Sequence, residues 1–465
     1  MRKGVFVLAP VALVAAIVVA CGGKERTSGF IDTNLPGDGG FEASQAFTPG
    51  ETPCAGLECK VVECNGGAST TLRGKVYDPA GSNPLYNVMV YIPGGEDPEN
   101  LPPMKDSTEE PDGIACETCA SVIVNPLRSA LTDGKGEFVL ENVPVDKDVP
   151  IVIQVGKWRR LLHVDVTKQC EENVIKDKTL KLPKNSDEGN MPQIAVTSGS
   201  YDALECLLRG IGIDDKEFVM GHDPGGHVHV FKGAGGGMGT PAQDFWNDAA
   251  QLRKYDMVLL SCEADTHVEN KGGNSAGARA SMYEYLNAGG KVFATHYHDI
   301  WFKGSPADEF KNLAKWAESA SSSSSSYDIN QTFPKGERLA EWLHEIGASS
   351  SLGKIDLEDE AIRATGVNEP ALAWISAPNG NPVYMTVNTP ISNPDGTPTE
   401  PEDQCGRAVI TGLHVVDPSK AAPKSIGACA IGPGGLNAQQ KAVEFLFFDL
   451  SACVTDDKVE PQPPK

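Results

Sequence analysis

The apolar residues of the chain follow three successive patterns, and each pattern predicts a different kind of segment. Residues 1–20 begin with two basic residues and continue as an apolar run, which is typical of a secretory signal peptide. Across residues 68–185, short runs with a period of two alternate with turn-forming residues, as in an antiparallel β-sandwich. Across residues 192–454, short apolar strands alternate with helices, as in an open, mostly parallel α/β sheet. We therefore predict a multidomain fold, a β-sandwich followed by an α/β sheet.

Two other stretches lack a periodic apolar pattern. Residues 21–67 are rich in Gly, Pro, Thr and acidic residues, which predicts a flexible tether whose cysteine-bearing end is pinned to the sandwich. Residues 455–465 are predicted to form a disordered tail. The chain has 465 residues, which is too long for one ordinary core. Two folded domains between a tether and a tail therefore agree with its length.

The first folded segment carries motifs of a known domain family. Gly74-x-Val76, Thr132-Asp-Gly-x-Gly-x-Phe138 and Val143-Pro144 resemble the carboxypeptidase regulatory-like (transthyretin-like) domain, which has a carbohydrate-binding-like fold. Asp133-Gly134 also provides the strongest hairpin signal in the chain. The resemblance implies a spacer or contact module without catalytic groups. Residues 94–127 depart from the family as a long insert.

The second folded segment carries motifs of another fold family. Tyr255–Leu260, Leu286–Val292 with His296, and Gly406–His414 resemble the class I glutamine-amidotransferase-like (flavodoxin-like) fold, in particular its ThuA-like branch. Where that family has the nucleophile turn Gly-x-Cys-x-Gly, this chain has Thr295-His-Tyr-His298, without the thiol or the glycines that permit a sharp turn. The resemblance therefore implies the fold without glutaminase activity. The order of the two domains resembles predicted lipoproteins of deltaproteobacteria.

The end of the signal segment predicts where the protein resides. Val18-Val-Ala-Cys21 resembles a bacterial lipobox, in which Cys21 receives palmitate and other acyl chains and becomes the first mature residue. Gly22 follows without an acidic retention residue, so the resemblance implies a lipid anchor in the outer membrane of the cell envelope. The predicted membrane contact is the lipid on Cys21.

The charge of the chain restricts its partners. The formal net charge is −23 at pH 7, so phosphate backbones would repel the protein, and a nucleic-acid partner is not expected. Trp158, Arg159 and Arg160 form a basic, aromatic patch in this acidic chain. They are candidate contacts to a glycan or to an acidic envelope protein. In the alternative interpretation, Trp158 covers core and the arginines pair with nearby carboxylates.

The twelve cysteines indicate an oxidising compartment, in which disulfides persist. Their pairing cannot be fixed by sequence alone. A CxxC pair without a second one nearby is more typical of a structural bridge than of a zinc site. Cys262 ends a predicted strand and is a candidate nucleophile, but we favour a disulfide for it. The expected bridges join Cys206 to Cys262, Cys405 to Cys453 and Cys116 to Cys119, which leaves Cys429 as the free thiol.

Metal-ligand side chains follow three predicted strands of the α/β segment. Because the carboxyl ends of parallel strands share one edge of a sheet, these side chains are candidates for a single site. No cofactor is certain, but a divalent metal such as zinc, iron or manganese fits the donor types. In the alternative, the histidines only form structural hydrogen bonds. The candidate ligands are His296, His298, His414, His267, Asp299 and Glu263.

Two classes of function agree with these patterns. The first is a surface-exposed lipoprotein with a non-catalytic role in binding or envelope assembly, which the missing nucleophile turn and the tether favour. The second is an exported, metal-dependent hydrolase or carbohydrate-modifying enzyme, which the histidine cluster favours. The sequence favours the first class of function.

Overall fold

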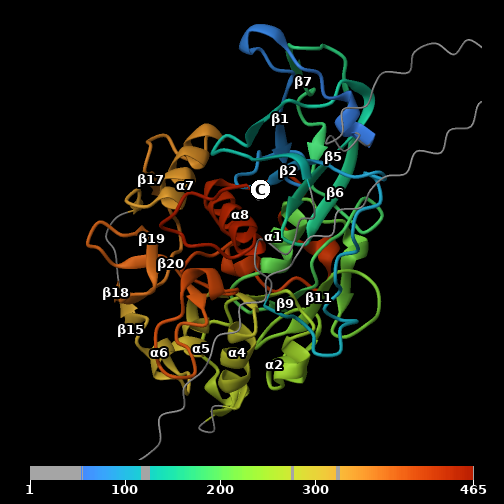
Figure 1. The fold of residues 1–465 in the computed structure, drawn as a ribbon. Coiled ribbons are helices and arrows are strands. Elements are labelled where there is room, and N and C mark those ends of the chain that lie inside the picture. Colours follow the sequence, from blue (N-terminus) through green and yellow to red (C-terminus); the bar gives the residue numbers. More distant parts are fainter. Residues whose placement is uncertain (1–53, 55, 117–125, 274–276, 321–324, 464–465) are drawn as a thin grey trace, which may run out of the picture. The chain divides into compact units, whose positions relative to one another are not determined.

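The computed structural model describes Cys54 and residues 56–116, 126–273, 277–320 and 325–463. Figure 1 traces these residues from blue to red along the chain. Cys21, Cys119, the signal segment and most of the tether lie outside the described residues. Residues 54–465 cluster into one compact unit that contains both β-rich parts. No helix of the described part is long and apolar enough to cross a membrane.

Two four-stranded sheets form the first folded part. They share one core, in which Leu72 and Phe138 of one sheet and Val90 and Ile153 of the other are buried. One sheet has the order β4-β1-β7, with β8 also paired to β1, and the other has the order β3-β2-β5-β6. The strands are β1 (Thr71–Tyr77), β2 (Met89–Pro93), β3 (Pro126–Leu131), β4 (Glu137–Glu141), β5 (Asp146–Val155), β6 (Trp158–Val166), β7 (Glu172–Val174) and β8 (Leu180–Lys181).

The sequence predicted purely antiparallel pairing in this part, but the structure also contains parallel pairs. β7 and β8 both run parallel to β1, because the chain crosses from the second sheet back to β1 after β6. A turn forms at Asp133, whose carboxylate accepts hydrogen bonds from the backbone of Lys135 and Glu137. It is not the predicted hairpin, because β3 pairs with β2 and β4 pairs with β1 in the other sheet. The part is therefore a mixed two-sheet structure.

An eleven-stranded mixed sheet forms the second folded part. Six neighbouring strands, β10-β11-β9-β13-β14-β21, run parallel, and the sheet continues antiparallel through β20, β19, β16 and β17. The parallel strands are β9 (Ile194–Ser198), β10 (Phe218–Met220), β11 (Val228–Lys232), β13 (Met257–Leu260), β14 (Lys291–Thr295) and β21 (Gly406–Thr411), with β12 (Thr240–Pro241) beside β11.

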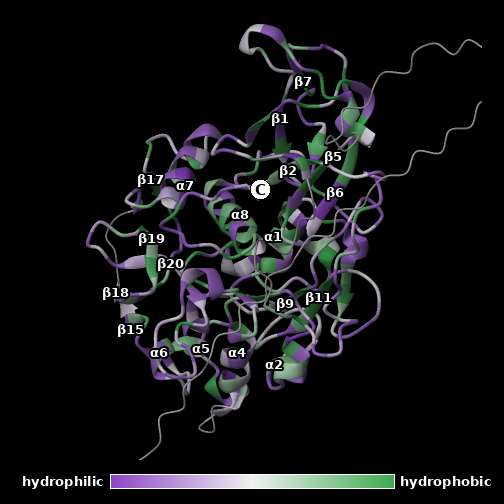
Figure 2. Ribbon diagram, viewed as in Figure 1, coloured by the Kyte–Doolittle hydropathy of each residue, from purple (hydrophilic) through white to green (hydrophobic). Residues whose placement is uncertain are grey.

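The central strands form because their residues are apolar on both faces. β9, β13 and β21 are buried along their full length, as expected of parallel strands with both faces covered. Hydrophobic colour accordingly runs along β9 and β11 in Figure 2. The helices are α1 (Leu204–Gly210), α2 (Gln243–Trp246), α3 (Ala249–Leu252), α4 (Gly277–Asn287), α5 (Ile300–Lys303), α6 (Asp308–Lys311), α7 (Pro334–Glu345) and α8 (Ala438–Ser451).

The antiparallel extension was not predicted from the sequence. It comprises β16 (Ser326–Ile329), β17 (Lys354–Asp356), β19 (Leu372–Ser376) and β20 (Pro382–Thr389). A separate antiparallel pair, β15 (Ala314–Ala320) and β18 (Ile362–Val367), lies outside this sheet. β16 with β17, and β15 with β18, pair across long stretches of chain. β19 and β20 instead form a hairpin across the turn that contains Asn379-Gly380, a signal that the prediction did not use.

Four disulfides lie between described cysteines, and they correct the predicted pairing. Cys206 of α1 bonds Cys429 rather than Cys262, because α1 packs beside the turn Ile426–Ala428. Cys262 is the free cysteine among the described residues, and it is buried. The four disulfides join Cys54 to Cys59, Cys64 to Cys170, Cys116 to Cys405 and Cys206 to Cys429.

The two other predicted bridges are also wrong. Cys116 of the long insert bonds Cys405, just before β21, so neither Cys116–Cys119 nor Cys405–Cys453 can form. Cys453 is disulfide-bonded too. The insert is thus tied to the α/β sheet instead of being closed on itself.

Candidate metal centre

Three strand ends bring a thiol and two imidazoles together. Cys262 lies two residues after β13, His296 directly follows β14, and His414 lies three residues after β21. These strands are neighbours in the parallel part of the sheet, so their carboxyl ends meet at one edge. One ligand atom from each residue lies within 4.8 Å of those of the other two. This set of three residues is called the Cys262 centre below.

The distances within the Cys262 centre suit a small ion. The Cys262 Sγ lies 3.2 Å from the His296 Nδ1, and the two imidazole ring centroids are 5.2 Å apart. One thiolate and two imidazoles are donors that zinc and related transition metals accept. Three protein donors leave a tetrahedral ion one open position, as in catalytic zinc sites.

Burial sets the protonation of two members of the centre. Burial, with His414 and Arg363 nearby, lowers the pKa of His296 to about 3, so its imidazole is neutral near pH 7. Burial also raises the pKa of Cys262 to about 12, so its thiol stays protonated without a metal. A neutral imidazole has a lone pair for a metal, and metal binding would displace the thiol proton.

The backbone at His296 is unusual. His296 has a φ of +47°, in the left-handed region that non-glycine residues seldom adopt. The turn His296–Asp299 starts there, immediately after β14. Tyr297 lies against the His296 ring at a centroid distance of 4.0 Å, and the Arg363 guanidinium covers Tyr297 at 4.4 Å. Strained residues of this kind cluster at functional sites.

The Asp202 carboxylate lies beside the His414 ring. One Asp202 carboxylate oxygen accepts hydrogen bonds from the backbone nitrogens of Ala203 and Val415. The other lies 3.4 Å from the His414 Nδ1. A carboxylate beside one ring nitrogen favours a proton there and leaves the other nitrogen free to bind a metal. Tyr201 packs edge-on against the same ring.

The predicted ligands divide into two groups. His296 and His414 belong to the Cys262 centre, whereas the other four have different partners. His298 is buried with both ring nitrogens in use, one toward the Ser261 carbonyl and one accepting from the Trp301 indole. Asp299 pairs with Arg363 and Lys303. These two residues are structural.

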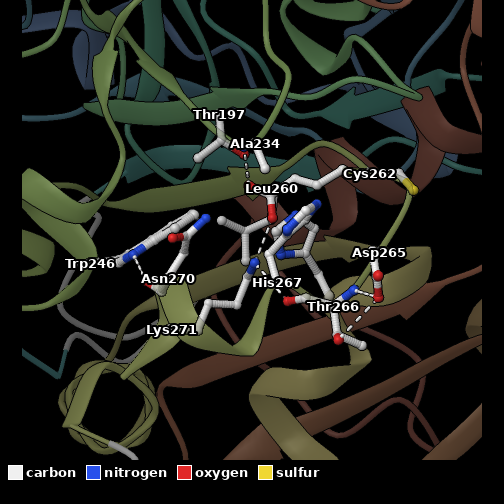
Figure 3. Close-up of polar contacts among 12 residues, drawn as sticks. Thr197, Ala234, Trp246, Leu260, Cys262, Asp265, Thr266, His267, Asn270 and Lys271 are labelled. Carbon is white, nitrogen blue, oxygen red and sulfur yellow. Dashed lines mark hydrogen bonds and ion pairs between the residues drawn. The ribbon is translucent and has the colours of Figure 1, made fainter. Parts of the chain in front are cut away.

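Glu263 and His267 also lie outside the set. Glu263 is buried and pairs with the equally buried Lys271, whose ammonium also donates to the Thr266 carbonyl. Figure 3 shows the Cys262 sulfur turned away from Lys271. His267 has Glu269 as its partner. The structure thus brings two of the six predicted ligands, His296 and His414, together with Cys262 and gives the other four separate partners.

The basic, aromatic patch has a structural role. Trp158 is fully buried and packs edge-on against Phe447 and Phe448 of α8. Arg159 is nearly buried and donates to Asn190, and Arg160 pairs with Glu188. Trp158 therefore covers core, as in the alternative interpretation, and its buried ring offers no face for a ligand to stack on.

Cys262 is the member of the centre that sequence reasoning missed. The sequence did contain a signal for this ligand, because Cys262 follows an apolar strand just as His296 and His414 follow two other strands. The expectation that an exported cysteine is oxidised outweighed it.

No protein-family model matches the chain, and no curated protein matches it significantly. The geometry of the Cys262 centre is therefore the basis for its functional interpretation.

Proposed function

We propose that the α/β part is a metal-dependent enzyme of the hydrolase or carbohydrate-modifying class, exported to the cell envelope and anchored there through Cys21. The convergence of Cys262, His296 and His414 from three strand ends carries this proposal. The set has the donor types of a transition-metal site and one ligand fewer than a closed tetrahedral site requires.

Each residue has a distinct part in the proposed site. Cys262 would supply the thiolate, and His296 and His414 the neutral imidazoles. A bound divalent metal lowers the pKa of water and polarises carbonyl oxygens. Asp202 would keep the His414 ring in place, and Tyr201, which is partly exposed at 36%, would border the approach.

The frame around the centre supports an exported protein. Four disulfides stabilise the described part, which agrees with an oxidising compartment. The sandwich, which resembles a transthyretin-like domain, would present an amidotransferase-like sheet away from the outer membrane.

A non-catalytic role in binding or envelope assembly is the second candidate. It is favoured by the burial of the centre, since Cys262 is 0% and His414 only 4% exposed. A metal held there without access for a substrate would stabilise the fold, as structural zinc does.

Cobalt titration of the metal-free protein distinguishes these possibilities. We expect visible absorption with a thiolate charge-transfer band that saturates at about one equivalent and disappears in Cys262→Ser. Added azide should shift the spectrum if the ion has an open position. Saturation without an azide shift would support the second candidate, and no thiolate band at all would overturn the metal site.

A further inference from the structure

The start of β18 contacts both histidine-bearing loops of the Cys262 centre. The backbone nitrogen of Ala361, which precedes β18, donates to the Gly412 carbonyl at 2.8 Å, two residues before His414. A Cβ atom at Gly412 would lie 1.9 Å from the Ala361 carbonyl oxygen, so only glycine permits this approach. β18 also packs against the turn His296–Asp299. A strand outside the main sheet thus lies beside two of the three loops that carry the proposed ligands.

Arg363 of β18 contacts the turn His296–Asp299 at two points. Its Nε donates to the Asp299 Oδ2 at 3.0 Å, and its guanidinium carbon lies 4.4 Å from the centroid of the Tyr297 ring. Arg363 and Asp299 are both buried, so salt and water screen this charged contact little. The Asp299 carboxylate therefore holds the guanidinium in place on the Tyr297 ring.

Tyr297 lies between Arg363 and His296. Its ring centroid is 4.0 Å from that of the imidazole, with 31° between the two planes. One face of a ring has no room for two planar groups at such distances, so the imidazole and the guanidinium occupy opposite faces. The His296 Nδ1 in turn lies 3.2 Å from the Cys262 Sγ. A continuous series of contacts therefore runs from Asp299 through two side chains and the imidazole to the sulfur.

The conformation of His296 depends on such support. Its positive φ of +47° is unfavourable for a residue with a side chain and persists only where the surrounding structure enforces it. Its side chain is also partly exposed, whereas His298 and His414 are buried. Core packing therefore does not by itself fix the His296 imidazole.

We infer that Arg363 is a positioning residue, which holds the Tyr297 ring against His296 and so keeps the His296 Nδ1 directed toward Cys262. This inference rests on the proposed function, in which the His296 imidazole and the Cys262 thiolate bind the same ion. Arg363 itself touches neither the ion nor the substrate and acts through Tyr297.

A purely structural role would be limited to the ion pair with Asp299. Lys303 provides the internal comparison, because its Nζ pairs with the same Asp299 oxygen at 3.1 Å, whereas the cation over the Tyr297 ring is Arg363. The side chain of Lys303 is also largely buried, at 15% exposed. Loss of either cation therefore weakens the pairing of Asp299, but only loss of Arg363 frees Tyr297.

Cobalt affinity of the mature protein, measured by competition with a chelator, separates the two roles. Arg363→Met should bind cobalt about 10- to 100-fold more weakly, as is typical when a residue that orients a metal ligand is lost, and its thiolate charge-transfer band should change. Lys303→Met is the control and should bind as tightly as the wild type. Equal affinities of Arg363→Met and the wild type, or equal losses in Arg363→Met and Lys303→Met, would overturn the inference.

A second pair of variants tests the ring itself. Tyr297→Leu should lose cobalt affinity to the same extent as Arg363→Met, and Tyr297→Phe, which keeps the ring, should restore it. This pair decides the question if Arg363→Met does not fold. Similar affinities for the leucine and phenylalanine variants would contradict a role for the stacked ring.

The orientation of the His296 ring can also be read without a metal, by nuclear magnetic resonance of protein labelled at histidine Cε1. The His296 signal is the one that His296→Ala lacks, and the stacked Tyr297 ring should displace it from the ordinary imidazole position. This displacement should disappear in Arg363→Met and persist in Lys303→Met. A protein that shows this pattern but binds no cobalt keeps the positioning role and removes the proposed enzyme. Tight cobalt binding with a signal that Arg363→Met leaves unmoved removes only the positioning role.

Discussion

Asp202 shows how much of the candidate centre depends on a residue that is not a ligand. Its side chain is fully buried in the loop after β9. It accepts a hydrogen bond from the Val415 backbone, which holds the loop, and its other oxygen lies 3.4 Å from the His414 Nδ1. Orienting carboxylates of this kind tune metal sites from outside the ligand set.

Replacing Asp202 by asparagine should weaken metal binding. The amide oxygen of the new side chain would still accept from the backbone, but its NH₂ group would face the His414 Nδ1 and favour the wrong tautomer. We expect metal affinity to fall by about 10- to 100-fold, measured by competition with a chelator. Asp417→Asn, an exposed change close to His414, is the control and should leave affinity unchanged. Equal affinities for all three proteins would rule out this role of Asp202.

The predictions from sequence differ most from the structure in the partners of single residues. The sequence placed His296 and His414 at one sheet edge correctly, because strand ends follow from apolar periodicity. It could not show that His298 uses both nitrogens internally, nor that Cys206 faces Cys429. Such pairings depend on the packing of distant segments, which a local pattern does not contain.

At the scale of elements, a buried charge network joins four segments. Arg407 of β21 donates to Asp449 of α8 and to Asp457 of the C-terminal segment. Lys335 of α7 lies near both carboxylates. Burial alone would raise the pKa of Asp457, but Arg407 and Lys335 lower it to about 2. The segment after α8 is therefore held to the sheet at Asp457, and further ion pairs join Lys458 to Glu369 and Glu460 to Arg338, within the range that the sequence predicted as a tail.

Removing Arg407 should strongly destabilise the protein. Arg407→Met would leave Asp449 and Asp457 buried with one cation between them, which typically costs about 3–5 kcal/mol of unfolding free energy. Urea denaturation measures this change. Arg73→Met is the control, since Arg73 is half exposed and pairs at the surface with Glu172, and such pairs contribute about 0–1 kcal/mol. Similar losses in both variants would contradict a stabilising network.

The prediction of elements succeeded where the pattern was local. The strands β13 and β21 lie within the motif segments Tyr255–Leu260 and Gly406–His414, and β14 begins within the segment Leu286–Val292. The strands β16 and β17 escaped prediction because their partners are distant in the chain, whereas β19 and β20 form a local hairpin whose Asn379-Gly380 turn was not recognised. Register between distant strands is decided by the assembled core.

At the scale of the whole molecule, two carboxyl groups join the sandwich to the α/β part. Asp78 follows β1, Glu444 lies on α8, and both are fully buried. Asn83 donates to Glu444, and backbone groups donate to Asp78. Burial and the adjacent Asp78 raise the pKa of Glu444 well above its usual value. Burial therefore favours the protonated form of Glu444 beside the Asp78 carboxyl group.

This contact should make stability depend on pH. Because the pKa of Glu444 is raised on folding, the native state holds a proton that the unfolded state releases above pH 4.5, and stability falls as pH rises. The slope from one group is at most about 1.4 kcal/mol per pH unit. Glu444→Gln, which mimics the protonated acid, should flatten the fall between pH 5 and pH 8 in urea titrations. Glu141→Gln, at an exposed position, should follow the wild type, and a parallel fall in Glu444→Gln would contradict the raised pKa of Glu444.

The most direct test of the account is the metal content of the mature protein, measured by plasma mass spectrometry after loading with zinc and dialysis. The account predicts about one ion per chain in the wild type and its loss in His296→Ala/His414→Ala. The control, His163→Ala/His267→Ala, removes two histidines outside the centre that pair with surface glutamates, and it should keep the ion. A folded wild type without metal, or equal metal in both double variants, would contradict the Cys262 centre.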